Sequence, residues 1–128
     1  MARYIPNSAY DAYFAFFTAC TRQDLTSDVS TPTDLTGSLA NVTLDSGDFT
    51  IGAGDNGGRK LTIAEQIQVD VTADGTTRHA VLSYFNDPTW EIRMVTTTVE
   101  REVSNTLEDK VNMGSWYLDV AGPENPVV

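Results

Sequence analysis

Apolar and polar residues alternate along most of the chain from residue 39 onwards, and a period of two is typical of half-buried β-strands. The clearest segment is 66–72, where we expect Ile67, Val69 and Val71 to face the core. Shorter alternating segments precede it and end in residues typical of turns. Their apolar positions are Val42 and Leu44, Phe49 and Ile51, and Leu61 and Ile63. The pattern therefore predicts several short strands.

Two turn signals in the middle of the chain predict which of these strands pair. Asp74-Gly75 suits the positive φ angles of a tight hairpin turn, so we expect 66–72 to pair with 78–85. A second turn at 86–88 leads into a long strand that continues to about Val103. These two hairpins would form the antiparallel centre of the fold.

The last strand, from Val111 to Val120, changes the phase of its apolar positions between Met113 and Trp116. A bulge near Gly114-Ser115 would restore the register, because a shift of one residue turns every side chain to the opposite face. With seven or so short strands separated by turns, the predicted fold is mainly β. We expect an antiparallel β-sandwich or a small β-barrel with an N-terminal α-helix.

The N-terminal segment has a different pattern, because it holds half of the twelve aromatic residues. Their spacing predicts an α-helix that begins after Ser8, with rings along one face and alanines on the other. No Lys, Arg or Glu occurs between Ala9 and Thr21, whereas an ordinary surface helix has a charged outer face. We therefore expect this segment to contact another chain. The candidate contact residues are Tyr4, Tyr10, Tyr13 and Phe16.

The length of 128 residues predicts a single domain, 1–128. Residues 1–22 are the aromatic helical segment. Residues 23–38 are rich in Thr, Ser and Asp, and we expect them to be a linker loop. The β domain is predicted to span 39–122, and 123–128 form a tail.

The charge balance bears on the partners of the protein. There are 18 acidic and 8 basic residues, and the formal net charge is −10. Nucleic-acid binding usually needs a basic patch, and the largest basic cluster is Arg59-Lys60, so we expect no nucleic-acid partner. The acidity suits a surface that faces a more basic partner. No apolar run approaches about 20 residues and no signal peptide is evident, so we expect no membrane partner and synthesis in the cytoplasm.

The residues that could carry chemistry lack the partners that chemistry needs. A Gly-x-Gly-x-x-Gly pattern occurs at 52–57, but 59–63 looks like a strand, whereas a dinucleotide site needs a helix there. Nearby acidic residues lack the spacing of a calcium loop. The single His79 and the single Cys20 form no triad or metal set in the sequence. We therefore expect no catalytic residues, no cofactor and no metal.

Three parts of the chain combine strands and turns in a distinctive order: 46–55 running into 58–63, then 76–82, and finally 111–116. Together they resemble a family of small tailed-bacteriophage proteins encoded among the virion structural genes, over about 39–120. The resemblance implies a structural part of the virion. Within that class it implies a capsid decoration or cement protein, which binds the major capsid protein as a symmetric homo-oligomer. A trimer is the form we expect.

Three classes of function follow from these observations. The first is a non-enzymatic decoration protein, made in the host cytoplasm and placed on the capsid surface of the virion. The second is another virion component, such as a neck, tail or fibre-attachment protein. The third is a small soluble binding module or an enzyme, and an enzyme would need a pocket with convergent titratable groups.

Overall fold

The structure is a computed structural model that describes residues 5–55 and 57–120. Its helix α1 spans Asn7–Thr18, and a short 3-10 helix η1 spans Ser46–Asp48. The strands are β1 (Arg22–Thr26), β2 (Ser38–Thr43), β3 (Phe49–Ala53), β4 (Arg59–Ile63), β5 (Gln66–Asp70), β6 (Gly75–Asn86), β7 (Thr89–Val103), β8 (Lys110–Met113) and β9 (Trp116–Val120).

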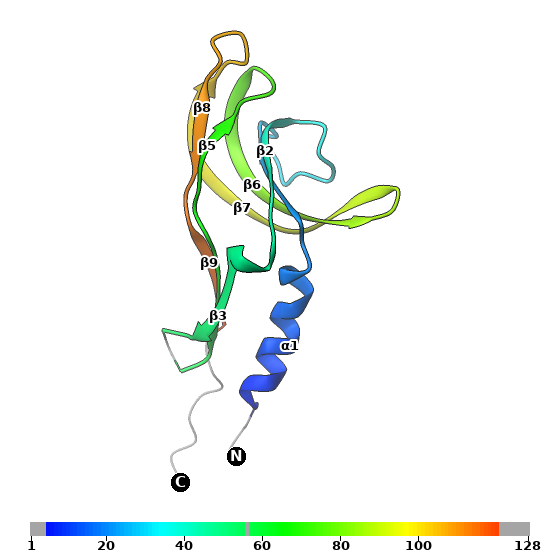
Figure 1. Cartoon of the computed structure of the whole chain (residues 1–128), viewed down its shortest axis with the longest axis vertical. Coiled ribbons are helices and arrows are strands. Elements are labelled where there is room, and N and C mark those ends of the chain that lie inside the picture. Colours follow the sequence, from blue (N-terminus) through cyan, green and yellow to red (C-terminus); the bar gives the residue numbers. More distant parts are fainter. Residues whose placement is uncertain (1–4, 56, 121–128) are drawn as a thin grey trace.

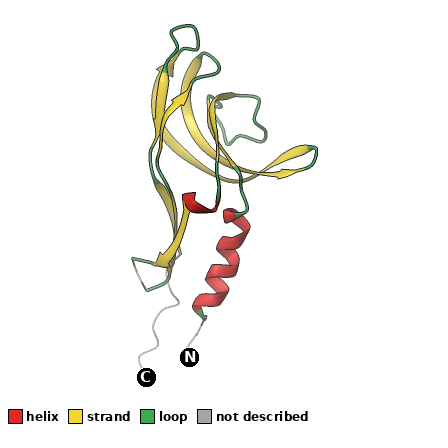
Figure 2. Ribbon diagram, in the orientation of Figure 1, coloured by secondary structure: helices red, strands yellow, loops and turns green. Residues whose placement is uncertain are grey.

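The strands form three antiparallel sheets. Helix α1 lies beside the sheet that contains β3 and β9, in the lower part of Figure 1. The strand orders are β2-β1-β6-β7, β3-β4-β9 and β5-β8. An isolated bridge between Ala40 and Val71 joins β2 to the segment after β5. Long, curved β6 and β7 extend beyond the other strands as an arm (Figure 2). The prediction of a mainly β, antiparallel fold with an N-terminal helix is confirmed, and the architecture is a sandwich rather than a closed barrel.

Two separate clusters of buried apolar side chains form the core. The upper cluster lies between the four-stranded sheet and β5-β8, and it consists of Leu25, Leu39, Ala40, Val69, Val71, Ala80, Val103, Val111 and Met113. The lower cluster lies between α1, the same large sheet and β3-β4-β9, and it consists of Phe14, Phe17, Cys20, Leu44, Leu61, Ile63 and Leu82. The large sheet therefore supplies one wall of both.

Helix α1 begins at Asn7, before the predicted start. Pro6 occupies the N-cap position with φ −67° and ψ 150°, and no side chain caps the helix. A proline is well suited to a helix start because its φ is already fixed near the helical value. Ser8 therefore lies inside the first turn rather than at the cap.

The segment 23–38 was expected to be a loop, and this expectation is wrong for its first part. Strand β1 pairs with both β2 and β6, and Gln23, Asp24, Leu25 and Thr26 are all buried. A polar strand can occupy this position because the Asp24 carboxylate accepts hydrogen bonds from Arg22 and Ser38. Only 27–37 is a loop.

The predicted hairpin through Asp74-Gly75 does not form. Strand β5 pairs with β8, with Val69 opposite Val111, while β6 pairs with β1 and β7. Pairing with β8 places Val69 and Val111 together in the upper cluster, which a local hairpin would not do. The Asp74 side chain instead accepts a hydrogen bond from the backbone of Asn105.

Ile67 was expected to face the core, and this prediction is wrong: the residue is 62% exposed. The register of β5 shifts between Gln66 and Val69, and Gln68 adopts φ 56°. This irregularity turns Ile67 outwards while Val69 and Val71 remain buried. A bulge therefore interrupts the alternation that the sequence shows.

The second predicted hairpin is confirmed, and the last strand needs a correction. Strands β6 and β7 pair from Asn86–Thr89 to Gly75–Val103 around a cis Asp87–Pro88 peptide bond. Instead of one bulged last strand, β8 and β9 are separate strands of different sheets: β8 pairs with β5 and β9 with β4. The break falls at Gly114-Ser115, where the phase of the apolar positions changes.

Candidate functional site

The outward face of α1 carries exposed aromatic rings and several exposed alanines. Tyr10, Phe14 and Phe17 are buried against the sheets, whereas Tyr13 and Phe16 are 48% and 49% exposed. Other exposed positions are Ala9, Ala12 and Ala15 of the helix and Ala19 at its C-cap, while the polar Asn7 and Ser8 are exposed in its first turn. A surface helix normally presents charged residues to water. Here the outward face, which we call the α1 surface, presents rings and methyl groups.

The charged residue of α1 is taken up by an ion pair. Asp11 is the single charged residue between Asn7 and Thr18, and its carboxylate lies 2.9 Å from the Arg59 guanidinium of β4. The pair fastens the helix to the three-stranded sheet. The Asp11 side chain stays 40% exposed, and Arg59 offsets its negative charge.

Arg93 of β7 holds the exposed ring of Phe16 in place. Its guanidinium carbon lies 4.0 Å from the centroid of the Phe16 ring and 4.0 Å from that of Tyr84. It also donates a hydrogen bond of 2.7 Å to the backbone oxygen of Phe16 and pairs with Glu91 at 2.8 Å. Cation–π contacts of this kind contribute about 0.5–1 kcal/mol each at exposed sites. Phe16 is therefore ordered while half of its surface faces solvent.

A β-bulge places Arg93 under the helix. Leu82 pairs with Met94, but the next residue, Ser83, pairs with Ile92, so Arg93 is the extra residue of β7. Bulges redirect side chains that strict alternation would place elsewhere. Nothing in the sequence indicates this bulge, and sequence analysis did not single out Arg93.

The four predicted contact residues do not lie together. Tyr13 and Phe16 lie on the α1 surface, and Tyr13 also packs on the buried Phe17 ring at a centroid distance of 5.2 Å. Tyr10 is only 9% exposed, so its ring belongs to the protein's own core and is not available at the surface. Tyr4 lies outside the described residues.

A second exposed aromatic pair lies at the end of the β6–β7 arm. Phe85 and Trp90 face each other across the hairpin with ring centroids 5.0 Å apart, and they are 45% and 36% exposed. The Arg22 guanidinium lies 5.3 Å from the Trp90 ring centroid. The two rings flank the predicted turn at 86–88, but their position on an arm became visible only in the structure (Figure 2).

The residues considered for catalysis, cofactor binding or metal binding lie in strands, turns or the core. The glycine-rich segment is the connection between β3 and β4, so a strand follows it, as expected. His79 lies in β6, and its Nδ1 is 2.9 Å from the backbone oxygen of Asp28. Burial raises the pKa of the Cys20 thiol to about 11, which keeps it protonated at neutral pH. Among residues 5–55 and 57–120, no three His, Cys, Asp or Glu side chains are grouped as metal ligands would be.

Asp24 is the one fully buried carboxylate among the described acidic residues. Two nitrogens of Arg22 approach its oxygens at 2.8 and 2.9 Å, and the Ser38 hydroxyl donates a further hydrogen bond. A buried charge is tolerated when it is paired and hydrogen-bonded in this way. This cluster joins β1 to the start of β2.

Two further findings concern the relations of the chain. None of its described helices has the length and apolar character needed to cross a membrane. No protein-family model, no curated protein and no solved structure matches the sequence.

Proposed function

We propose that the chain is a non-enzymatic structural protein of a tailed-phage virion, which decorates the capsid as a homo-oligomer. The observation that carries the proposal is the α1 surface, where two half-exposed rings and four exposed alanines occur without a charged residue on the outward face. An exposed apolar surface of this kind usually marks a contact with another protein. The assignment to a virion rests on the sequence resemblance.

The composition of the α1 surface suits a closely packed contact between chains. Alanines allow another backbone to approach closely, and aromatic rings are common among the residues that dominate binding energy. Phe16 is already held by Arg93, so little side-chain freedom is lost when a partner covers it. The net charge of −10 favours a partner surface, such as that of a capsid protein, that carries positive charge.

The proposal is tested with a double variant, Tyr13→Ala with Phe16→Ala, in the full chain. Sedimentation should show a trimer for the wild type and a monomer for the variant, and purified capsids should lose most of the bound variant. Truncating a well-placed ring in an interface costs about 2 kcal/mol or more, a factor of roughly 30 in affinity. The matched control is Tyr117→Ala, because Tyr117 is 59% exposed but lies on β9.

The test separates three outcomes. Unchanged oligomeric state and unchanged capsid occupancy of a folded double variant would refute the role of the α1 surface. Electron microscopy of particles that carry labelled protein then locates it. Labels repeated over the shell support decoration, whereas labels at a single vertex would identify a neck or tail component.

A further inference from the structure

The upper cluster is open along one side, between β7 and β8. The strand order runs β7-β6-β1-β2 and continues through the Ala40–Val71 bridge to β5 and β8. Strands β7 and β8 are consecutive and antiparallel, joined by the turn 104–109, and such neighbours usually pair. In the described chain they do not, so each leaves one strand edge unpaired.

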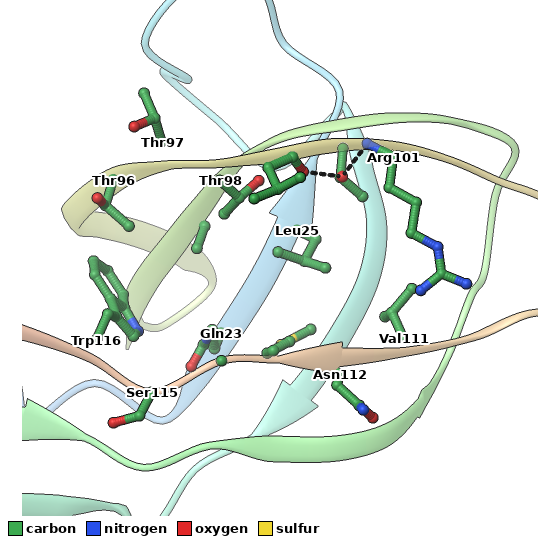
Figure 3. A pocket seen from close by; sticks show the side chains of 15 residues that line it. Gln23, Leu25, Thr96, Thr97, Thr98, Arg101, Val111, Asn112, Ser115 and Trp116 are labelled. Carbon is green, nitrogen blue, oxygen red and sulfur yellow. Dashed lines mark hydrogen bonds between the residues drawn. The ribbon is translucent and has the colours of Figure 1, made fainter.

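A pocket of about 420 Å³ occupies this gap. It is bordered by consecutive residues of β7, 96–99, and by consecutive residues of the β8–β9 segment, 111–116. Side chains alternate along a strand, so consecutive lining residues mean that the strand edges face the pocket. Figure 3 shows the two segments on either side of the gap, with Leu25 between them. The volume lies within the range of about 300–1,000 Å³ found for ligand sites.

Three side chains on the pocket wall bear buried polar atoms that lack a partner in the described chain. They are the Gln23 Oε1, the Thr98 Oγ1 and the Trp116 Nε1 atoms. Gln23 is only 1% exposed, and an unpaired buried polar group is costly. The Trp116 N–H can only donate, whereas the Gln23 oxygen accepts. A peptide unit supplies both an acceptor and a donor, as these groups require.

Strand β7 is distorted where it borders the pocket. Thr77 pairs with Arg101 and His79 pairs with Thr97, so β7 contains extra residues between these pairs. The Thr77 hydroxyl fills the gap: it donates to the Val99 oxygen at 3.0 Å and accepts from the Arg101 backbone N–H at 3.1 Å (dashed lines in Figure 3). The distortion leaves Val99 87% exposed. An apolar side chain therefore projects beside the open edge.

Arg101 gives the pocket wall a cation that has no ion-pair partner among the described residues. Of the Lys and Arg residues in the described ranges, Arg101 alone has no ion pair, although acidic residues outnumber basic ones by more than two to one. Its guanidinium lies on the pocket wall (Figure 3). A carboxylate on the ligand would supply the missing partner.

We propose that this pocket binds an extended peptide segment of another protein, added as a strand along the free edge of β7. The peptide presents apolar side chains at alternate positions to the upper cluster and an acidic side chain to Arg101. Recognition by strand addition uses main-chain hydrogen bonds for affinity and pockets for specificity. The unpaired edges favour a peptide over a small amphiphile, which has no backbone to pair with them. This site is separate from the α1 surface and does not depend on the proposed function.

The probe is a displayed library of random dodecapeptides, selected on the full-length protein. Selected sequences should have alternating β-branched or aromatic residues, an acidic residue and no internal proline. In hydrogen exchange, a selected synthetic peptide should slow the amides of 96–99. Slowing confined to another surface, or a library without enriched binders, would overturn the proposal.

Two pairs of variants locate the peptide. Arg101→Gln should weaken binding about tenfold or more, as expected for loss of a charge-assisted hydrogen bond. Lys110→Gln removes the same charge from an exposed pair outside the pocket and should leave binding unchanged. Gly114 borders the pocket, and a Cβ there meets no atom within 4 Å, so the side chain of Gly114→Leu has room to occupy pocket space and should abolish binding. Gly52 is equally open but does not border the pocket. Gly52→Leu is therefore the matched control.

Two outcomes in these variants would contradict the proposal. Equal affinities of Arg101→Gln and Lys110→Gln, both confirmed as folded, would show that the peptide does not use the pocket charge. Binding of decanoate that is lost in Gly114→Leu, without any peptide binding, would assign the pocket to small anionic amphiphiles instead.

Discussion

The two apolar clusters share one sheet but are covered in different ways. The lower cluster receives Phe14 and Phe17 from α1, so a helix of the same chain covers it. The upper cluster has no helix and is covered by β5 and β8, which stop short of β7. Val111 and Met113 therefore border a pocket, whereas Leu61 and Ile63 of the lower cluster have no exposed surface.

The difference shows how much a sandwich depends on what covers its sheets. An apolar sheet face must be buried against another element. A helix provides a broad cover with all its backbone groups satisfied internally, except at its ends. A pair of strands covers a sheet but adds free edges of its own. The lower half is thus complete within the described chain, while the upper half offers a place for a further strand.

The largest expected loss of stability comes from truncating a helix side chain that covers the lower cluster. Phe14 has no exposed surface, and we expect Phe14→Ala to lower the free energy of unfolding by about 4 kcal/mol, as large core truncations do. Urea denaturation would measure the change. Phe16→Ala is the control two residues away, and its loss should stay within about 1 kcal/mol because Phe16 is half-exposed. Similar losses in both variants would mean that α1 is not seated as described.

The buried Asp24 carboxylate lies on β1, an inner strand of the sheet that both apolar clusters share. Asp24→Ala removes the acceptor of the hydrogen bonds from Arg22 and Ser38, and we expect a loss of about 3 kcal/mol. The same change in an exposed pair, Asp70→Ala, should cost no more than about 1 kcal/mol. Thermal unfolding of the two variants side by side tests the contrast, and a smaller loss for Asp24→Ala would contradict it.

Equivalent truncations should distinguish the two clusters directly. Leu61→Ala creates a new cavity in the lower cluster, and we expect a loss of about 4 kcal/mol. Met113→Ala only enlarges an existing pocket that water can enter, so we expect about 2 kcal/mol. Denaturation curves give the difference in the free energy of unfolding between the two variants when their slopes are equal. A larger loss for Met113→Ala would show that the upper cluster is as tightly enclosed as the lower one.

The smallest expected effect is a pH dependence that belongs to the lower cluster alone. Burial raises the pKa of Cys20 to about 11 from 9.0, so the folded protein keeps a proton that the unfolded chain releases above pH 9. This contribution is fully present below pH 9 and is lost between pH 9 and 11, with about 1 kcal/mol gone at pH 10. Comparing the stability of wild type and Cys20→Ala at pH 8 and pH 10 isolates it. Identical pH profiles would contradict the assignment.

The positions of most strands could be predicted from the sequence, but their partners could not. The β6–β7 hairpin is local, so Asn86-Asp87-Pro88 and the alternation around it were sufficient. Strand β5 pairs instead with β8, about forty residues away, and no local signal distinguishes that partner from a hairpin neighbour. Strand β1 was missed because its polar residues are buried through the Arg22–Asp24 pair, which depends on the folded sheet.

The α1 surface could likewise be predicted only where the signal is local. The absence of charge on the helix indicated an unusual face, and Tyr13 and Phe16 lie on it. Helical spacing alone could not separate them from Tyr10, because the depth of a ring depends on the sheets beneath the helix. The role of Arg93 depends on a bulge, and the open seam beside β7 depends on which strands pair.

The pairing of β1 with β6 has a consequence for synthesis on the ribosome. Arg22 pairs with Ser83, about sixty positions later in the chain. At about 5–20 residues per second, β1 waits roughly 3–12 s for β6, whereas its other partner, β2, is made sooner. During that interval the lower cluster lacks Leu82 of β6, so the cover over Phe14 and Phe17 is incomplete. An interrupted chain that ends before β6 would therefore expose the phenylalanines that attract chaperones or other unfinished copies.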